Sequence, residues 1–446
     1  MSDFDTPGSS TSSAGTGSGS SWDAAPPPGA LPIARRLARR LVGPVERFLA
    51  IEAASGILLI VAAVVALAWA NSPWASSYHD TWTTPVGLTW GDGRVTTSTH
   101  VLVNDLLMAI FFLVVGLEIR REMHHGELSD RRRAMLPAIA AVGGMLAPAA
   151  IFALANLGGG DAARGWGVPM ATDIAFAVGI LTLLGRRVPA ALRVLLLALA
   201  IIDDLGAILV IAIFYSSGID ATGMTIAAGA LGGFAMLHAI GVRALGLYLL
   251  AGAVLWVGVL MSGVHPTIAG VLTGLLIPTE AWAGREEQSP AARLEHALHP
   301  WVAFAIMPLF ALANAGVDLG GLDLGAAPGV AIGVIAGLVV GKPLGIVLAC
   351  ALAVKLGVAA LPRGVTWRGM LVLGVVAGIG FTMALFIAQL AFAGHDALHA
   401  VAKISVLAAS VVAAVLALAL GRAFLTTTHA EGTAASAHEA ERSTEA

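Results

Sequence analysis

Cysteine and charged residues are scarce in this sequence. One of its 446 residues is cysteine, Cys350, and 12% of them carry charge. A single cysteine excludes a disulfide framework and a cysteine-based metal site. Because soluble domains contain about 25% charged residues, this composition, with a mean hydropathy of +0.85, indicates a membrane protein. The formal net charge of −3 argues against nucleic acid as a partner.

The two ends of the chain lack the apolar runs of the middle. Residues 1–30 are rich in Ser, Gly, Thr and Pro, and residues 424–446 in Thr, Ala, Glu and His, so we predict two disordered tails. The first tail shows no basic-then-apolar pattern, so we expect no cleavable signal peptide. Residues 31–50 (LPIARRLARRLVGPVERFLA) predict a basic amphipathic helix on the inner membrane surface. The membrane domain is predicted at 51–423.

That domain divides into apolar runs long enough to cross a bilayer, which takes about 20 residues each. Basic residues collect in the cytoplasmic loops of membrane proteins. With the N-terminus inside, Arg94 and Arg164 are the only two of the 25 basic residues that fall in outside segments. We therefore predict an all-α polytopic membrane protein with both termini cytoplasmic and twelve transmembrane helices, at approximately 52–71, 99–119, 134–157, 166–185, 190–215, 221–241, 244–262, 264–279, 299–320, 328–354, 368–393 and 399–421.

The first outside segment has the pattern of a β-hairpin. In TPVGLTWGDGRVTTS, two β-prone runs flank Gly91-Asp92-Gly93. An ordinary loop is the alternative. A hairpin at 86–97 would expose strand edges that invite pairing with a second copy, which predicts a homodimer.

Few ionisable side chains lie within the predicted spans. A carboxylate at mid-helix costs roughly 2.5–3.5 kcal/mol on insertion scales, so the adjacent Asp203 and Asp204 indicate a binding site. Structural ion pairs between helices are the alternative. Neighbours on a helix point about 100° apart, so one carboxylate can meet a cation while the other faces a water-filled cavity. The ionisable residues within the spans include Asp105, Glu118, Asp173, Asp203, Asp204, His238, Lys342 and Lys403.

Two spans contain residues that interrupt a helix, so we predict a discontinuous fourth and eleventh helix. A broken helix exposes N–H groups at one end and C=O groups at the other. The positive ends favour a carboxylate such as Asp173, and the negative ends a cation such as Lys342. Close helix packing is the alternative explanation for the glycines. The residues at the interruptions are Pro169, Thr172 and Asp173 in GWGVPMATDIAFAVG, and Gly378, Gly380 and Thr382 in GVVAGIGFTMALF.

These residue types suit the exchange of two cations. Na+ is a hard cation that prefers oxygen ligands, which Asp203, Asp204, Thr172 and water molecules can supply. Burial and a neighbouring negative charge both favour protonation of a carboxyl group, so the same carboxylates can hold protons. A site that holds either ion and opens alternately to each side is an antiporter. We expect Na+ and H+ to be transported through a lipid membrane without a cofactor.

Seven stretches, in order along the chain, are similar to those of a known family. Over nearly all of residues 35–423 the chain resembles the bacterial NhaA-type Na+/H+ antiporters. The resemblance implies inverted repeats and electrogenic exchange of external protons for internal Na+ or Li+ in the inner membrane, with activation at alkaline pH. Such exchange regulates internal pH and sodium. The stretches are NDLLMAIFFLVVGLEIRRE, PMATDIAFAVGIL, LALAIIDDLGAILVIAIFY, SGVHPTIAGVLTGLLIP, RLEHALHPWVAFAIMPLFALANAGV, GKPLGI and GIGFTMALFIA.

The resemblance also implies roles for individual residues. Asp204 resembles the main sodium-binding carboxylate of the family, and Asp203 resembles its partner, which carries a proton and pairs with the lysine matched by Lys342. Residues 172–173 and 378–382 match the interruptions of the two discontinuous helices. The residues that match the family's proposed cytoplasmic pH sensor are Glu118, Arg121, Glu122, Glu295, His296 and His299, and His265 matches another histidine linked to the pH response.

Three other functions fit part of the pattern. A Na+-coupled symporter of an organic solute on a related fold is the closest alternative. An intramembrane aspartyl protease needs two carboxylates from different helices that share a proton. Asp203 and Asp204 are adjacent on one helix, and GIGF contains no Asp, so we predict that the chain is not an enzyme. A channel fits the charges, but the predicted broken helices and Lys342 suit a gated site better.

Overall fold

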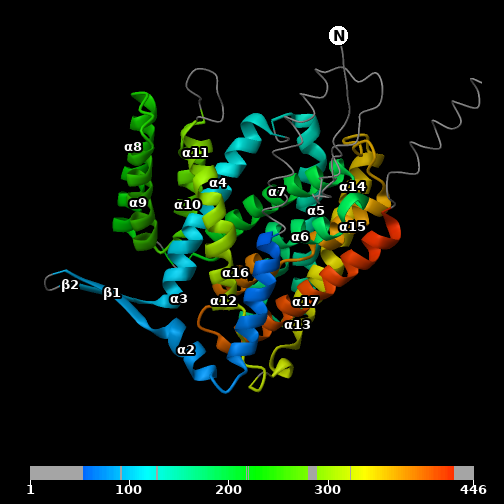
Figure 1. Ribbon diagram of the computed structural model, residues 1–446, viewed down its shortest axis with the longest axis horizontal. Coiled ribbons are helices and arrows are strands. Elements are labelled where there is room, and N and C mark those ends of the chain that lie inside the picture. Colours follow the sequence, from blue (N-terminus) through cyan, green and yellow to red (C-terminus); the bar gives the residue numbers. More distant parts are fainter. Residues whose placement is uncertain are drawn as a thin grey trace, which may run out of the picture. The chain divides into compact units, whose positions relative to one another are not determined.

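Long apolar helices run through most of the computed structural model (Figure 1). It describes residues 54–90, 93–126, 129–216, 218, 220–279, 289–321 and 323–425. The predicted N-terminal tail and amphipathic helix lie outside these ranges. The predicted C-terminal tail also lies outside them, except for its first two residues, where the last helix ends at Phe424.

Seven helices among the described residues are long and apolar enough to cross a membrane, and the number rises to ten if each of three bent helix pairs is one span. This supports a polytopic all-α membrane protein, and the number of twelve stays a prediction. The seven are α3–η1–α4 (Thr99–His124), α5 (Arg131–Ala155, apolar from Arg133), α7 (Ala190–Phe214), α9 (Leu245–Ser262), α11–η6–α12 (Pro290–Asn314), α13–η8–α14 (Pro328–Lys355) and α17 (Asp396–Phe424).

The three bent pairs each turn by more than 40° at a short break. The bent pairs are Ala54–Ala70 with α2 (Ala75–Thr83) at 113°, η2 (Asp161–Met170) with α6 (Ile174–Leu183) at 44°, and α15 (Trp367–Ala377) with α16 (Phe381–Ala391) at 48°.

Two further apolar helices are shorter or less apolar than these spans. They are α8 (Ala221–Ala239) and α10 (Thr267–Leu276).

Three of the long helices contain a stretch of π-helix, which widens the helix by one residue per turn and often marks functional sites. These stretches are η1 (Leu102–Leu107, between α3 at Thr99–Val101 and α4 at Met108–His125), η6 (Val302–Ile306, between α11 at Pro290–Trp301 and α12 at Met307–Asn314) and η8 (Gly337–Gly341, between α13 at Pro328–Ala336 and α14 at Lys342–Lys355). Short 3-10 turns lie at η3 (Gly185–Arg187) and η7 (Leu324–Ala326).

The helix predicted at 299–320 begins earlier, at Pro290. Ser289 starts it, because its hydroxyl accepts a hydrogen bond from the Ala292 N–H at 3.1 Å. Serine is a strong N-cap, and proline suits the first helical position because its missing N–H needs no partner there. The hydropathy pattern missed these first turns because they contain Arg293, Glu295 and His296.

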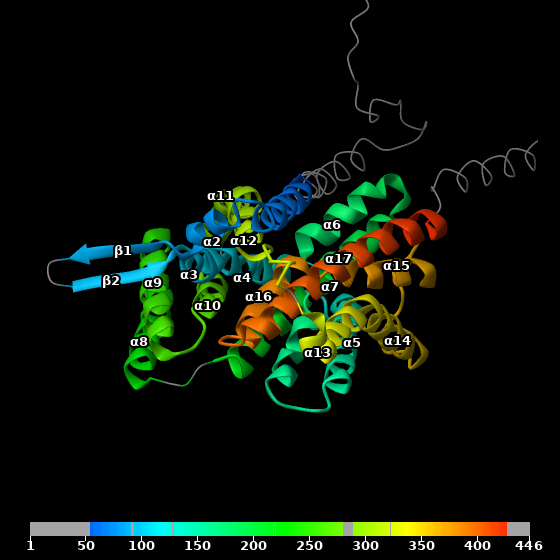
Figure 2. The same ribbon diagram turned by 90° about the horizontal axis from the view of Figure 1, so that it is seen from below.

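A two-stranded sheet precedes α3. Strand β1 (Pro85–Trp90) pairs antiparallel with β2 (Gly93–Ser98), in a register that runs from Pro85↔Ser98 to Trp90↔Gly93. Figure 2 shows this ribbon projecting away from the helices, towards the same end as α8 and α9. The homodimer that the hairpin suggested stays a prediction.

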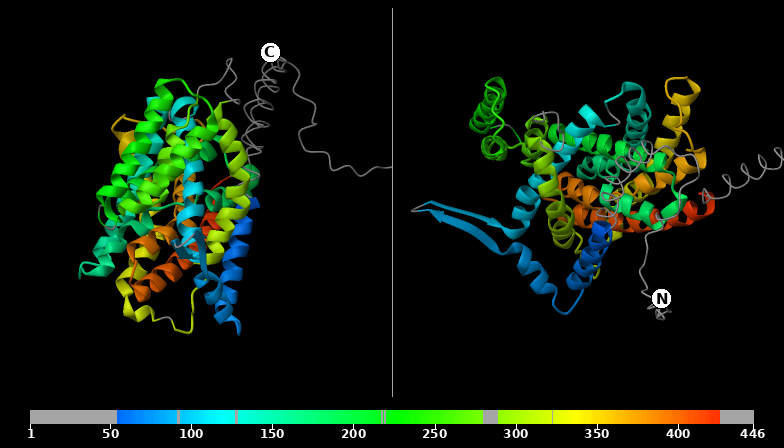
Figure 3. Two further views of the ribbon diagram at one scale, coloured as in Figure 1. Left: turned by 90° about the vertical axis from the view of Figure 1, so that its left-hand side faces the viewer. Right: turned by 45° about the horizontal axis from the view of Figure 1, so that its top comes forward.

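The helices divide into a peripheral pair and a packed centre. Helices α8 and α9 lie at the periphery, where they pack mainly against each other, and α9 also contacts α10 (Figure 3). In the centre, α16 is buried on all sides, with every residue from Phe381 to Ala388 inaccessible to solvent or lipid. It lies against α17, η2 and α12. The bent pair of α15 and α16 therefore meets the bent pair of η2 and α6 at this point.

Candidate cation-binding site

The first bent pair at the centre breaks just after Pro169. Helix η2 ends at Met170, Ala171 is extended (φ −76°, ψ 148°), and α6 begins at Ile174. Asp173 is the N-cap of α6: its Oδ1 accepts a hydrogen bond from the Phe176 N–H at 3.0 Å. Aspartate is a preferred N-cap because its side chain supplies an acceptor for an otherwise unpaired N–H group.

The second pair breaks between α15 and α16 at a position where only glycine fits. A side chain on Gly378 would collide with the Leu338 carbonyl oxygen. A Cβ on Gly380 would lie 3.0 Å from the Ala171 oxygen and 2.9 Å from the Ala384 Cβ. The two breaks are therefore in direct contact, and the glycines make that approach possible.

Hydrogen bonds connect the two breaks. The Asp173 N–H donates to the Ile379 oxygen at 2.8 Å, and the Thr172 hydroxyl donates to the Ala377 oxygen at 2.9 Å. In return, the Thr382 N–H donates to Asp173 Oδ2 at 3.1 Å, and the Thr382 hydroxyl donates to the same oxygen. The Asp173 carboxylate thus lies at the N-terminal ends of both α6 and α16, where the helix dipoles favour negative charge.

The adjacent aspartates of α7 lie beside this crossing. Asp203 and Asp204 are each 1% exposed. Lys342 Nζ is 2.6 Å from Asp203 Oδ2 and also donates to the oxygen of Met170, the last residue of η2. Lys342 is fully buried, and it follows directly on the π-helical stretch η8. The helix around Lys342 is thus modified but not broken.

In the part of the chain that the structure describes, Asp204 lacks the ion pair with Lys342 that Asp203 forms. Among the described residues, its Oδ1 is buried without a hydrogen-bond partner, and so is Oδ1 of Asp203. The negative charges of Asp173, Asp203 and Glu118 repel a negative charge on Asp204, whereas the positive charge of Lys342 attracts it. A buried carboxylate oxygen without a partner is costly, so this arrangement favours the uptake of a proton or a cation.

A separate ionic cluster connects α4 to α11. Arg121 forms ion pairs with the largely buried Glu295 and, at 3.5 Å, with Glu122. Glu118, one turn before Glu122, also acts on the charge of Arg121. A pocket of about 250 Å³ is lined by Arg121, Glu122, Glu295 and His296. Glu118 does not line it.

The three histidines of the predicted pH sensor differ in their surroundings. His296 lines the pocket, and its Nδ1 lies 2.9 Å from the Ala292 oxygen of its own helix. His299 lies one turn further along α11 and does not line the pocket. His265 does not line the pocket either, and its ring contacts Thr267 (2.7 Å) and Asp105 (3.7 Å).

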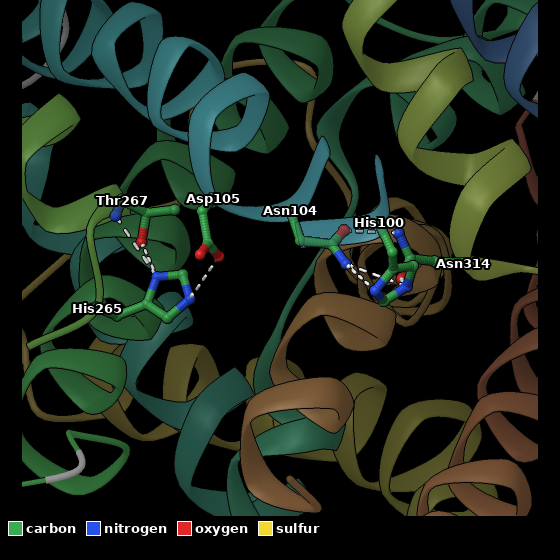
Figure 4. A network of polar contacts seen from close by, with 6 residues as sticks. All are labelled: His100, Asn104, Asp105, His265, Thr267 and Asn314. Atoms are coloured by element: carbon green, nitrogen blue, oxygen red, sulfur yellow. Dashed lines mark hydrogen bonds and ion pairs between the residues drawn. The ribbon is translucent and has the colours of Figure 1, made fainter. Parts of the chain in front are cut away.

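Figure 4 shows a second polar region, which has two halves. In one half, the ring of His265 lies between Thr267 and Asp105. The other half contains residues for which the sequence predicted no role. Asn314 of α12 donates to Asn104 Oδ1 at 2.8 Å, and its Oδ1 lies 3.2 Å from the ring of His100. Two asparagines in apolar spans were the available signal.

The comparisons with known proteins show the family of the chain. A family model described as Na+/H+ antiporter 1 matches residues 46–420. The chain belongs to this family. The Na(+)/H(+) antiporter NhaA 2 of Sorangium cellulosum is 55% identical over 460 residues, which cover 94% of this chain and 98% of the relative. A Myxococcus xanthus protein of the same name is 54% identical over 459 residues (94% and 97%). The Na(+)/H(+) antiporter NhaA of Acidovorax sp. is 53% identical over 400 residues (88% and 94%).

This membership of the Na+/H+ antiporter 1 family confirms the resemblance that the motifs indicated. One further contact at the crossing had no signal in the sequence. The Phe381 N–H at the start of α16 donates to the hydroxyl of Ser410 in α17, at 3.1 Å. Serine is common in apolar spans, so LAASVV alone singles out nothing.

Proposed function

We propose that this chain is an electrogenic Na+/H+ antiporter of the bacterial inner membrane, which expels Na+ or Li+ in exchange for external protons. The single observation that carries the proposal is the pair of buried carboxylates on α7, of which Asp204 has an oxygen with no partner among the described residues. The membership of the Na+/H+ antiporter 1 family supports the same ions. The comparisons lend no support to a symporter of organic solutes.

In this proposal Asp204 and its neighbours bind one cation species at a time. A proton or a Na+ ion each neutralises the negative charge that Asp173, Asp203 and Asp204 place together, so the two compete. Asp203 shares its charge with Lys342 at 2.6 Å. When a cation is held by both aspartates, the attraction between Lys342 and Asp203 weakens, which links cation binding to proton release from this pair.

The helix crossing provides fixed charges around this site. Asp173 lies at two helix N-termini, and Lys342 lies at the C-terminal carbonyl of η2. These half-helix dipoles stabilise both charges without a counterion from solvent. The side chain of Thr172 also lies beside Asp203, and its hydroxyl oxygen can ligate Na+.

We further propose that the cluster of Arg121, Glu122, Glu295 and His296 regulates exchange with pH. The pocket that it lines places carboxylates, a guanidinium and an imidazole within a small volume, so protonation changes the ion pairs between α4 and α11. Glu295→Gln tests this role, because it removes the ion pair that connects Arg121 of α4 to α11. An unchanged pH profile of exchange in this variant would exclude it.

We also propose twelve spans with both termini in the cytoplasm. The seven long helices and the three bent pairs account for ten of them. Helices α8 and α10 supply the other two, because both are apolar and each lies beside a long helix, α9 and α4 respectively. The distribution of basic residues supports this orientation.

The test of the central proposal is proton movement in everted membrane vesicles after addition of NaCl, LiCl or KCl, between about pH 6.5 and about 8.5. We expect Na+ and Li+, but not K+, to release protons from wild-type vesicles. Asp204→Asn should abolish this release, whereas Asp80→Asn, at an exposed aspartate of α2, should leave it unchanged. No cation-dependent release from the wild type at any pH would disprove antiport.

A further inference from the structure

Helix α16 begins without a cap from its own segment. Its N-cap residue is Gly380, which has no side chain to accept a hydrogen bond. A larger residue does not fit, because a Cβ there would lie 2.9 Å from Ala384 and 3.0 Å from the Ala171 oxygen. The first N–H groups of a helix need acceptors from outside the helix, and those of α16 are buried.

Two acceptors come from two other helices. The Thr382 N–H donates to Asp173 Oδ2 at 3.1 Å, and the Phe381 N–H donates to the Ser410 hydroxyl, also at 3.1 Å. Ser410 is 2% exposed and lies in α17, which packs against both α15 and α16. Helix α17 is thus a third partner of the crossing.

The two caps differ in charge. Asp173 also accepts hydrogen bonds from the Thr382 hydroxyl and the Phe176 N–H, and its charge acts on Asp204. Its hold on α16 therefore depends on the charge at the cation site. The Ser410 hydroxyl carries no charge, so its hydrogen bond to α16 does not depend on a titrating or cation-binding group of its own.

We propose that Ser410 is a positioning residue for cation binding. It holds the N-terminus of α16 so that the Thr382 amide and hydroxyl stay aligned with Asp173 while the charge at Asp204 changes. This inference rests on the proposed cation site at the crossing, and it adds α17 to the elements that build that site.

Ser405 provides a matched control on the same helix. It is also 2% exposed, but its hydroxyl donates to the Val401 oxygen of its own helix, at 2.6 Å. Removal of either hydroxyl makes a similar small cavity in α17. Only the removal of the Ser410 hydroxyl leaves an N–H group of α16 without an acceptor.

The experiment compares Ser410→Ala, Ser410→Thr and Ser405→Ala in the full-length chain. Loss of the net contribution of one typical hydrogen bond weakens an equilibrium roughly three- to tenfold. We expect Ser410→Ala to raise the apparent KM for Na+ by about this factor, with the maximal rate within about twofold of wild type. Ser410→Thr, which keeps the hydroxyl, should restore the KM, and Ser405→Ala should not change it.

Amide hydrogen exchange gives a readout that does not depend on transport. Peptides that cover residues 378–386 should exchange faster in Ser410→Ala than in wild type and Ser405→Ala, because the Phe381 amide loses its acceptor. Equal exchange and an unchanged KM in Ser410→Ala, or equal effects of both alanine variants, would overturn the inference. Absence of Na+-driven exchange in the wild type would instead refute the proposed function, and amide exchange would still decide the role of Ser410.

Discussion

At the scale of single residues, the buried ion pair of Lys342 and Asp203 is not explained by stability alone. Both side chains are fully buried, and Nζ and Oδ2 are 2.6 Å apart. Such a pair adds little net stability, because desolvation offsets the attraction, yet removal of one partner leaves the other charge buried alone. An apolar pair would hold the helices together at least as well.

We expect Lys342→Ala to lower the free energy of unfolding by about 3–5 kcal/mol, because it leaves Asp203 as an unpaired buried charge. Combination with Asp203→Asn should recover most of this loss without restoring transport. Thermal and chemical unfolding of the purified protein in detergent measures both effects. The control is Lys355→Ala, at the exposed end of the same helix. An equal loss of unfolding free energy in Lys342→Ala and Lys355→Ala would contradict the argument.

At the scale of elements, glycine sets the distance between helices around the site. Helices α5 and α14 touch through Gly143 and Gly345, and a Cβ on Gly345 would lie 2.7 Å from the Ala147 Cβ and collide with the Gly143 oxygen. Lys342 lies one turn before Gly345 on α14. The contact of the two helices therefore also decides how far the ammonium group reaches towards Asp203.

Gly345→Ala should push α14 away from α5 and cost about 1–3 kcal/mol of stability, the usual effect of overpacking. The shift should also slow Na+/H+ exchange, since it moves Lys342. Gly232→Ala on α8 is the matched control, because nothing lies within 4 Å of a Cβ there. Unfolding and transport measurements on both variants test this, and two equally neutral substitutions would show that the close contact is not required.

At the scale of the whole molecule, the proposed orientation depends on the asymmetry of basic residues between loops. The only cysteine of the chain, Cys350, is buried. Its replacement by alanine yields a cysteine-free chain into which single reporters can be placed. Exposed positions exist in both groups of loops, at Asp80 in α2 and at Ser129 between α4 and α5.

In the Cys350→Ala background, we expect Asp80→Cys to react with a membrane-impermeant maleimide in intact cells. Ser129→Cys should react only in everted vesicles, because the proposed topology places it in the cytoplasm. Transport by both variants confirms that they are folded. The opposite labelling pattern would invert the topology, and labelling of both positions from one side would change the number of spans between them.

The sequence alone singled out many of the residues that the structure brings together at the candidate site, because local patterns carry the necessary signals. The cost of charge in an apolar helix singled out Asp203, Asp204 and Lys342. Pro169 lies two residues before one break, and Gly378 and Gly380 lie within the other. The asparagines of Figure 4 and Ser410 gave no comparable signal, because small polar residues occur in many membrane helices.

By itself, the sequence determined which segments are apolar enough for a membrane, where the helices are weakest, and which residues carry buried charge. These properties depend on composition and on neighbours along the chain. Only the tertiary structure decided that Thr382 donates to Asp173, 209 residues away, that Lys342 reaches the end of η2, and that Ser410 caps α16. Such contacts depend on how distant helices pack, and packing follows from the shapes of many side chains together.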